Sequence, residues 1–278
     1  MSSLSSPLPS SPTFPHVVRR LRAAGCVFAE DEARLLVGAA RSAAELAAMV
    51  DCRVAGKPLE HILGWTEFCG LKIAVEAGVF VPRRRTEFLV RQALDQAGGR
   101  PGEVVVDLCC GSGAVAAALL AALPDAEVHA ADLEPAAVRC ARRNVSAGGG
   151  FVHEGDLFAA LPGALRGRVD LLVVNAPYVP TDAIGLMPPE AREHEPRLAL
   201  DGGTDGLDVL RRVVVGAPSW LAPGGRLLFE TSAQQAPSLV DAAARTGLIA
   251  RIAVSDELAA TVVVAVPLAG DPPTSDRQ

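Results

Sequence analysis

The sequence of 278 residues is poor in aromatic residues, with eight Phe, two Trp and a single Tyr, and it has no long hydrophobic run. Its longest apolar candidate spans residues 114–123, whereas a membrane-spanning helix needs roughly 18 or more residues. We therefore expect no membrane association. Residues 1–15 are rich in Ser and Pro and lack the basic start and apolar centre of a signal peptide. We expect disordered tails at 1–15 and 269–278.

The cysteines lack the spacing of a metal site or a disulfide framework. No C-x-x-C pair occurs, and no His lies at a ligand spacing from a Cys. This pattern predicts no bound metal and favours reduced thiols in a cytoplasmic protein. The six residues concerned are Cys26, Cys52, Cys69, Cys109, Cys110 and Cys140.

The sequence also lacks an excess of basic residues. Its formal net charge is −6 and its pI is about 5.4, whereas proteins that grip nucleic acid through phosphates are usually basic. We expect no stable nucleic-acid binding, and a monomer or weak dimer. Half of the residues are apolar and 21% are charged, as in ordinary globular proteins. The length fits one large domain and a smaller one.

Two regions differ in their hydrophobic pattern. Residues 16–68 carry apolar positions at helical spacing, with Ser42 as a candidate N-cap and Glu45 three residues later, and we predict a small helical domain. Residues 69–90 predict a hairpin linker. From 91 to 268, short apolar segments alternate with helical ones, which predicts a parallel sheet covered on both faces. The strands are expected at 103–108, 126–133, 150–157, 169–175, 225–231, 248–255 and 261–267.

The first of these strands leads into the glycine-containing stretch "DLCCGSGAVA". Gly111 and Gly113 let the main chain turn tightly into a helix and approach a ligand. Asp132 ends the next strand, about 20 residues later, where a carboxylate accepts hydrogen bonds from ribose hydroxyls. The stretch is neither a complete G-x-G-x-x-G motif nor a Walker loop. The alternative interpretation is a glycine-rich turn that binds nothing.

An acidic residue ahead of the glycines, Asp107, suits a ligand with an amino acid end rather than a pyrophosphate. With Asp132, it points to S-adenosyl-L-methionine as cofactor. Asp156, after the third strand, is placed for an adenine edge. The predicted cofactor-binding residues are Asp107, Cys109, Gly111, Gly113, Asp132, Leu133, Asp156, Leu157 and Asn175.

The stretch "NAPY" at 175–178 follows the fourth strand and resembles the [NDS]-P-P-[YF] motif of methyltransferases that act on a planar nitrogen. Residues 56–75, 81–90 and 195–213 are similar to the release factor glutamine methyltransferases, and the likeness covers about 16–267. It implies an α/β protein: a seven-stranded, Rossmann-like class I AdoMet-dependent methyltransferase domain behind a small helical substrate-recognition domain. The family's activity is methylation of the Gln side-chain amide in the Gly-Gly-Gln motif of peptide-chain release factors.

The resemblance implies three catalytic residues. Asn175 would hold the Gln amide, Pro177 would supply a main-chain carbonyl, and Tyr178 would pack against the flat amide. The sequence departs from the family at several positions. Ala176 replaces the first Pro of the motif, and Arg84 and Arg85 stand where the family usually has Pro and an acid. The other departures are Cys109 and His194.

Several alternatives remain. One alternative is an N-methyltransferase that acts on a nucleic-acid base or another planar nitrogen. Another is an interaction protein that binds AdoMet without catalysis. A nicotinamide dehydrogenase ranks last, because the dinucleotide fingerprint is incomplete. The three adjacent arginines at 83–85 form a charged face or contact a partner. Glu230 is either a surface or a site residue, and Glu195 and Arg197 are expected to brace the loop after "NAPY" by charge pairing. Residues 181–196 are expected to form a long binding loop.

Overall fold

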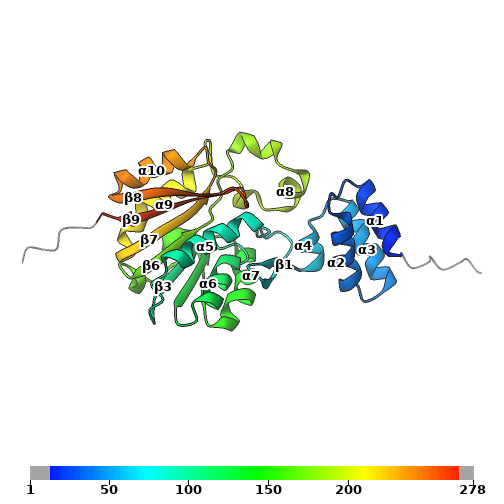
Figure 1. Ribbon diagram of the computed structural model, residues 1–278, viewed down its shortest axis with the longest axis horizontal. Helices are drawn as coiled ribbons and strands as arrows, with labels where there is room; N and C mark the ends of the chain where they lie inside the picture. Colours follow the sequence, from blue (N-terminus) through cyan, green and yellow to red (C-terminus); the bar gives the residue numbers. More distant parts are fainter. Residues whose placement is uncertain (1–12, 269–278) are drawn as a thin grey trace, which may run out of the picture.

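The computed structural model describes residues 13–268, in two parts joined by a narrow connection (Figure 1). A small helical bundle stands at one end and a larger α/β part at the other. Residues 1–12 and 269–278, where we expect tails, lie outside the described residues. The first helix begins at Phe14, so the expected tail at 1–15 extends slightly too far.

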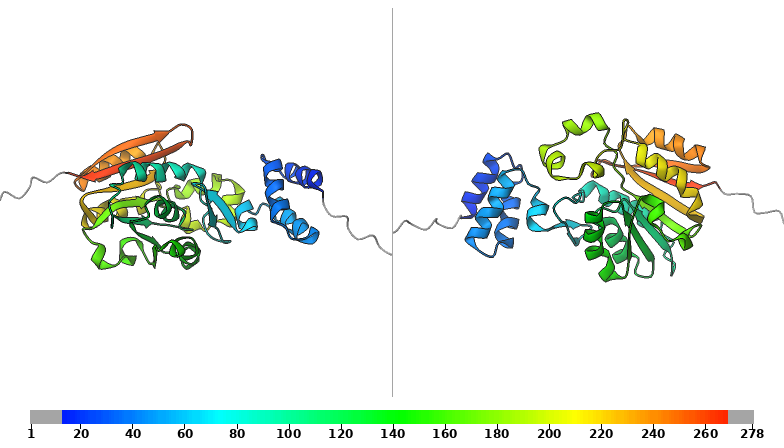
Figure 2. Two further views of the ribbon diagram at one scale, coloured as in Figure 1. Left: turned by 60° about the horizontal axis from the view of Figure 1, so that its bottom comes forward. Right: turned by 180° about the vertical axis from the view of Figure 1, so that it is seen from behind.

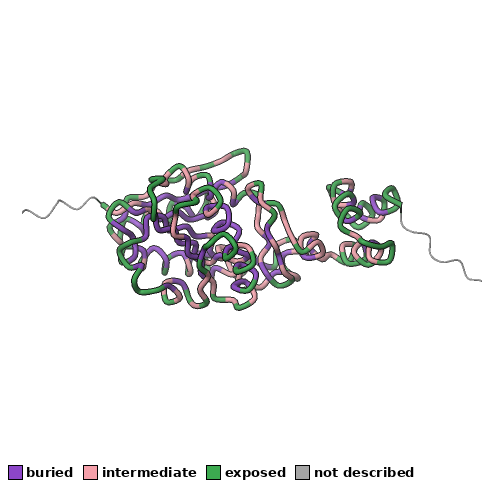
Figure 3. Tube along the Cα trace, turned by 90° about the horizontal axis from the view of Figure 1, so that it is seen from below, coloured by how far each residue is buried: buried purple, intermediate pink, exposed green. Residues whose placement is uncertain are grey.

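The bundle consists of α1 (Phe14–Ala23), α2 (Ala29–Ala39), α3 (Ala43–Val54) and the short α4 (Leu59–Leu63). Val17, Leu21 and Leu36 are fully buried in its own core, which is separate from the buried residues of the larger part in Figure 3. The predicted N-cap is confirmed, because Ser42 Oγ accepts a hydrogen bond of 3.1 Å from the Glu45 N–H. Such a cap satisfies an amide that the helix leaves unpaired.

The connection is a hairpin of β1 (Trp65–Phe68) and β2 (Leu71–Ala74). It starts at Trp65, inside the range 16–68 that was expected to be helical. It is followed by the 3₁₀ turn η1 (Arg84–Thr86) and by α5 (Glu87–Gln96), so the boundary expected at residue 90 falls within a helix. Asn144 holds the hairpin, since its side chain accepts the Ala74 N–H at 2.8 Å and donates to the Ala74 carbonyl at 2.9 Å.

The larger part is built on a seven-stranded sheet with the order β5-β4-β3-β6-β7-β9-β8. The pairings among the first five strands in this order are parallel, as predicted. The sheet departs from the predicted parallel arrangement at one edge, because β9 is antiparallel to both β7 and β8. Only residues 256–259 join β8 to β9, too few for a crossover connection. The strands are β3 (Val104–Leu108), β4 (Glu127–Asp132), β5 (Phe151–Glu154), β6 (Val169–Val174), β7 (Leu221–Thr231), β8 (Leu248–Ser255) and β9 (Ala260–Pro267).

Helices cover both faces of this sheet (Figures 1 and 2). One face packs on α5, α6 (Ala114–Ala122) and α7 (Pro135–Val145). The other packs on α9 (Asp208–Gly216) and α10 (Ala236–Arg245). Side chains of β3 alternate between the two faces, as a strand requires, with Val105 in one core and Val106 in the other. No helix among residues 13–268 is long and apolar enough to cross a membrane.

Residues 179–200 leave the end of β6 and lie beside the helical bundle. They contain the 3₁₀ segment η5 (Thr181–Leu186) and α8 (Pro189–His194), so the expected long loop is largely helical. Arg53 of α3 donates a hydrogen bond of 3.0 Å to Glu190 of α8, which ties the bundle to this segment. The remaining short 3₁₀ turns are η2 (Ser146–Gly148), η3 (Leu157–Ala160), η4 (Gly163–Leu165), η6 (Arg197–Ala199) and η7 (Ala217–Ser219).

Candidate functional site

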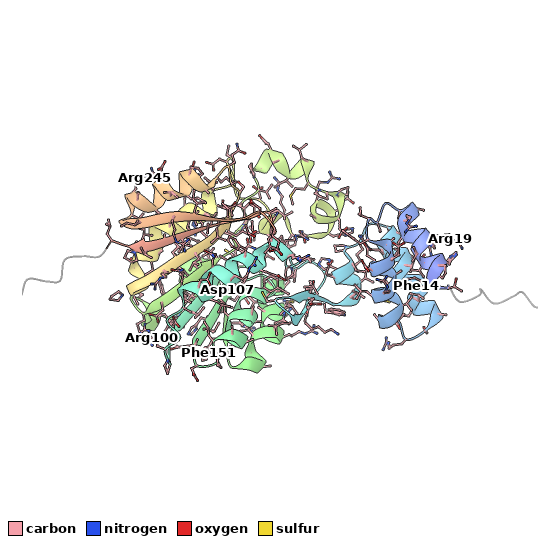
Figure 4. All side chains as sticks on the ribbon, in the orientation of Figure 1. Phe14, Arg19, Arg100, Asp107, Phe151 and Arg245 are labelled. Carbon is pink, nitrogen blue, oxygen red and sulfur yellow. The ribbon has the colours of Figure 1, made fainter. Side chains whose placement is uncertain are left out.

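A cleft with a volume of about 220 Å³ opens at the carboxyl ends of β3, β4 and β6. The strand order reverses between β3 and β6, and ligands of open α/β sheets bind at such a point. Asp107 of β3 lies near this point and is labelled at the centre of the α/β part in Figure 4. The sequence-predicted residues that line the cleft are Asp107, Cys109, Gly111, Asp132, Leu133, Asp156, Leu157, Asn175, Pro177 and Tyr178.

Asp132 fixes the glycine loop to the end of β4. Its Oδ2 accepts the Gly111 N–H at 2.8 Å and its Oδ1 accepts the Glu134 N–H at 2.9 Å. Burial raises the pKa of this carboxyl, although the two main-chain donors oppose the shift. Each carboxylate oxygen can accept a further hydrogen bond. Asp132 is therefore suited to take a pair of hydroxyl groups from a ligand.

Asp107 is the most deeply buried acid of the cleft, with 1% of its surface exposed. Burial raises its pKa to about 8, and the one opposing contact is the Ala116 N–H at 3.1 Å from Oδ2. No Arg or Lys among residues 13–268 pairs with it. A cationic ligand group would supply the missing counter-charge, because an opposite charge favours the ionised carboxylate.

The two glycines of the loop have different roles. Gly111 has a φ of +55°, and a Cβ added there would meet no atom within 4 Å, so it would project into open space. Gly113 has a φ of +77°, and a Cβ there would lie 2.9 Å from Val145 and 3.1 Å from the Ala141 Cα. Gly113 is absent from the cleft lining. Its assignment as a cofactor-binding residue stays a prediction, and the close approach of Gly113 to Ala141 and Val145 allows α6 to begin close against α7.

Four further residues that are predicted to bind the cofactor line the cleft. Asp156 pairs with Arg212 of α9 at 2.6 Å, so one of its oxygens is already engaged. Leu133 and Leu157 add apolar surface to the lining. Cys109 adopts a φ of +59°, and burial raises the pKa of its thiol well above the usual range. A thiol in this state stays protonated and unreactive.

The stretch from Asn175 to Tyr178, named here the acceptor loop, follows directly after β6. Asn175 Nδ2 donates to Thr86 Oγ1 at 3.4 Å. The side-chain oxygen of Asn175 takes no part in this hydrogen bond, and Asn175 lines the cleft. It is therefore suited to accept a hydrogen bond from a bound group.

Tyr178 contributes a polar contact that the sequence did not reveal. Its hydroxyl donates to Glu230 Oε1 at 3.0 Å, and Arg85 Nε donates to the same oxygen at 3.2 Å. Glu230 is 2% exposed, and its Oε2 has no partner among the described residues. Burial and the Glu230 carboxylate raise the pKa of Tyr178, so its hydroxyl remains a donor. The interpretation of Glu230 as a surface residue is therefore wrong.

The main chain of the acceptor loop rests on a glycine segment at 202–206. Gln235 Nε2 donates to the carbonyls of Tyr178 and Asp205, both at 2.9 Å. A Cβ at Gly206 would lie 2.3 Å from the Tyr178 oxygen, and one at Gly202 would lie 2.7 Å from the Pro177 oxygen. Only glycine allows this approach. The Pro177 carbonyl, expected to accept from a substrate, thus faces Gly202.

Glu195 braces the far side of the cleft, as expected. Its Oε1 accepts the Val81 N–H at 3.1 Å and its Oε2 accepts from Arg83 at 2.6 Å. Arg197 also forms the expected charge pair, with Asp201 at 3.1 Å. The Glu195 contacts link the segment after the acceptor loop to the linker before α5, whereas the Arg197–Asp201 pair lies within that segment.

Comparisons with known proteins identify the family. The family described as "Methyltransferase small domain" matches residues 70–186. The release factor glutamine methyltransferase of Geobacter sulfurreducens is 43% identical over 208 residues, which cover 73% of this chain and 72% of that protein. The chain belongs to the release factor glutamine methyltransferase family. The predicted family and fold class are thereby confirmed, and the protein is an enzyme that uses S-adenosyl-L-methionine.

Two further similarities bear on acceptor and fold. A 4-amino-L-phenylalanine/4-methylamino-L-phenylalanine methyltransferase of Streptomyces pristinaespiralis is 40% identical over 194 residues, covering 67% of this chain and 65% of that protein. The crystal structure of a methyltransferase from Pyrococcus furiosus superimposes with a TM-score of 0.53 at 15% identity, covering 71% of this chain and 88% of that one. The latter likeness supports the fold alone.

The residues that line the cleft suit the polar groups of S-adenosyl-L-methionine. Asp107 has no cationic partner in the described chain and suits the ammonium of an amino acid end. Asp132 suits the ribose hydroxyls, and the space in front of Gly111 admits a ligand close to the main chain. The acceptor loop lines the same cleft.

Proposed function

We propose that the enzyme methylates the side-chain amide nitrogen of the Gln in the Gly-Gly-Gln motif of a peptide-chain release factor. One observation carries the proposal. Asn175, which can accept a hydrogen bond, lines the same cleft as Asp107 and Asp132, which suit the cofactor. The cofactor supplies an electrophilic methyl group on a sulfonium sulfur. The protein must hold a planar nitrogen in line with it.

An amide nitrogen is a poor nucleophile, because its lone pair is delocalised into the carbonyl. The acceptor loop would make this nitrogen more reactive. Asn175 Oδ1 and a main-chain carbonyl accept the two N–H hydrogens, which orients the nitrogen and raises its electron density. Orientation of this kind contributes up to ~7–11 kcal/mol in ideal cases. The resemblance assigns this second carbonyl to Pro177, whose oxygen lies close to Gly202, and Ala176, which also lines the cleft, is the alternative. No strong base is needed, because the methylated nitrogen is acidic.

Tyr178 would pack its ring against the flat amide, and the Glu230 hydrogen bond would hold the ring in place. The ring's hydroxyl is engaged away from the acceptor, so the residue acts through its face. On the cofactor side, Asp107 would hold the ammonium and Asp132 the ribose, with Asp156, Leu133 and Leu157 around the adenine. Cys109 would contribute a neutral wall.

The helical bundle would recognise the protein substrate. It contacts α8, which belongs to the segment after the acceptor loop, through the Arg53–Glu190 ion pair. A large substrate that touches both parts would therefore be placed relative to the cleft. We further propose that the enzyme acts in the cytoplasm as a monomer or weak dimer without stable nucleic-acid binding.

The substrate is tested by incubating the enzyme with a purified release factor and methyl-labelled S-adenosyl-L-methionine. We expect label on the Gln of Gly-Gly-Gln, located by mass spectrometry, and none on a release factor in which this Gln is replaced by Glu. Label that persists after the replacement would show that another group is the acceptor.

A second candidate acceptor is the aryl amine of a free amino acid, as in the name of the Streptomyces relative. The observation that favours it is Arg85, a half-exposed cation in the cleft that suits a carboxylate. Incubation with 4-amino-L-phenylalanine tests it. Methylation of this amine at a rate above that of the release factor would make it the principal substrate, and no methylation would remove it.

A further inference from the structure

The three adjacent arginines at 83–85 do not form one charged face. Arg83 and Arg85 line the cleft, whereas Arg84 lines a separate groove between the β1–β2 hairpin, α5 and α6. Arg84 and Arg85 are neighbours within η1 but line different hollows. Arg85 therefore belongs to the acceptor side of the site, and Arg84 provides a neighbouring arginine outside it.

The two cleft arginines are each anchored on a buried glutamate. The side chain of Glu195 is 1% exposed and pairs with Arg83, and that of Glu230 is 2% exposed and pairs with Arg85. The Arg85 side chain itself is 46% exposed. The negative end of the Arg85–Glu230 pair is thus shielded from the cleft, while the positive end faces solvent and ligand.

The anchoring leaves the outer edge of the Arg85 guanidinium open. Its Nε is used by Glu230, and neither terminal nitrogen donates to another residue within 13–268. The guanidinium carbon lies 5.7 Å from the centre of the Tyr178 ring. The next residue, Thr86, contacts Asn175. Two parallel N–H donors held in this way match the two oxygens of a carboxylate.

We propose that Arg85 forms a carboxylate-binding subsite next to the acceptor loop, so that the enzyme prefers methyl acceptors with a carboxylate near the reacting nitrogen. This inference rests on the proposed function of the cleft. The carboxylate has two possible sources: an acidic side chain beside the acceptor residue in a protein, or the α-carboxylate of a free amino acid. Lys in place of Arg85 would keep the charge but lose the planar pair of donors.

The test compares kcat/KM for substrate pairs that differ only in charge. One pair is a Gly-Gly-Gln peptide followed by Glu and the same peptide with that Glu as its methyl ester. The other pair is glutamine and its α-methyl ester. For the wild-type enzyme, we expect a preference of about ten-fold for the carboxylate form in at least one pair, the size typical of a charge-assisted hydrogen bond. The pair that shows it identifies the source.

Three variants test whether Arg85 causes the preference. Arg85→Gln should reduce the ratio to about one, Arg85→Lys should give an intermediate ratio, and Arg84→Gln should keep the wild-type ratio. Because each ratio is measured on one enzyme preparation, partial loss of folded protein cancels. Equal rates for charged and neutral forms in both pairs, or a preference that survives in Arg85→Gln, would overturn the proposal.

Failure of the subsite and failure of the proposed function give different results. Methylation of glutamine without a charge preference contradicts the subsite alone. If no glutamine substrate is methylated, the proposed function fails, and calorimetric binding of the same pairs to the full chain with S-adenosyl-L-homocysteine decides on the subsite. Tighter binding of the carboxylate forms, lost in Arg85→Gln, supports it, and equal affinities overturn it.

Discussion

The hydroxyl of Tyr178 donates a hydrogen bond of 3.0 Å to Oε1 of Glu230, and this contact joins the acceptor loop after β6 to the end of the neighbouring strand β7. Glu230 is buried, and its Oε2 lacks a partner within residues 13–268. A buried carboxylate with few partners depends on each of them. The position of the Tyr178 ring therefore depends on the Glu230 carboxylate, which does not itself line the cleft.

Tyr178→Phe should keep the ring and remove the donor. We expect the free energy of unfolding to fall by ~1–3 kcal/mol, since a buried acceptor loses its partner, while the affinity for S-adenosyl-L-methionine stays within about two-fold. Denaturant unfolding and calorimetry measure the two quantities. In a double-mutant cycle with Glu230→Ala, the two losses should not add, because both remove one contact. Additive losses would contradict the coupling.

Asp107 predicts how stability depends on pH. Its pKa is raised from 3.8 to about 8 by burial, so the native state holds a proton that the unfolded state releases between these values. The free energy of unfolding of the cofactor-free enzyme should therefore decrease as pH rises from about 4 to about 8. Asp107→Asn should lose this part of the dependence. Parallel curves for the two proteins between pH 6 and 8 would contradict the assignment.

Asp107 also predicts how cofactor affinity depends on pH. A cationic ammonium binds the ionised carboxylate, so the affinity for S-adenosyl-L-methionine should rise between pH 6 and 8 as the proton leaves. Calorimetry at these two values measures it, and Asp107→Asn should bind weakly at both. An affinity in the wild type that falls over this range would show that Asp107 does not bind the ammonium.

Gly111 and Gly113 should respond differently to substitution by Ala. Gly113→Ala forces a Cβ to 2.9 Å from Val145, and overpacking typically costs ~1–3 kcal/mol, so the fold should be destabilised. Gly111→Ala has open space around its Cβ, although its φ of +55° is strained for Ala, so it should weaken cofactor binding at a smaller cost in stability than Gly113→Ala. Thermal unfolding and cofactor titration of both variants separate the effects. The reverse pattern would place Gly113 at the ligand.

The Arg53–Glu190 pair predicts a role for the bundle in substrate binding. Glu190→Gln should raise KM for an intact release factor by about five-fold, since a partly buried ion pair contributes roughly 1 kcal/mol, and should leave KM for a short Gly-Gly-Gln peptide unchanged. Glu193→Gln is the matched control, because Glu193 lies on the same helix and, among residues 13–268, pairs with its neighbour Arg192 and not with the bundle. An equal rise for protein and peptide would contradict a role in protein recognition.

Most of the fold could be predicted from the sequence because it depends on local pattern. Each of the seven strands overlaps an expected stretch, since runs such as Val169–Val174 are mostly apolar and bounded by breakers, although β7 begins four residues earlier than expected, at Leu221. The position of β9 between β7 and β8 could not be predicted, because pairing order depends on contacts between distant segments. The hairpin start at Trp65 was missed for a related reason, as helical and strand patterns merge there.

The motifs place Asp107, Asp132 and Asn175 at strand ends, and the structure brings all three to one cleft, while their roles stay predictions. Glu230 was left open because a single acid at a strand end has no pattern that distinguishes a buried from an exposed position. Its contacts come from η1 and the acceptor loop, far away in sequence. The close contact of Gly113 with α7 could not be predicted, because a glycine in a motif does not reveal whether a ligand or a neighbouring helix requires it.

The central claim is that Asn175 acts on the methyl acceptor and not on the cofactor. The direct measurement is a single-turnover rate of methyl transfer to a release factor, together with the dissociation constant of S-adenosyl-L-methionine, for the wild type and Asn175→Ala. The account predicts a rate at least ~100-fold lower, the scale of one preorganised contact to a reacting group, with the dissociation constant changed by less than about three-fold. Equal losses in rate and affinity would contradict it, because Asn175 would then serve the cofactor.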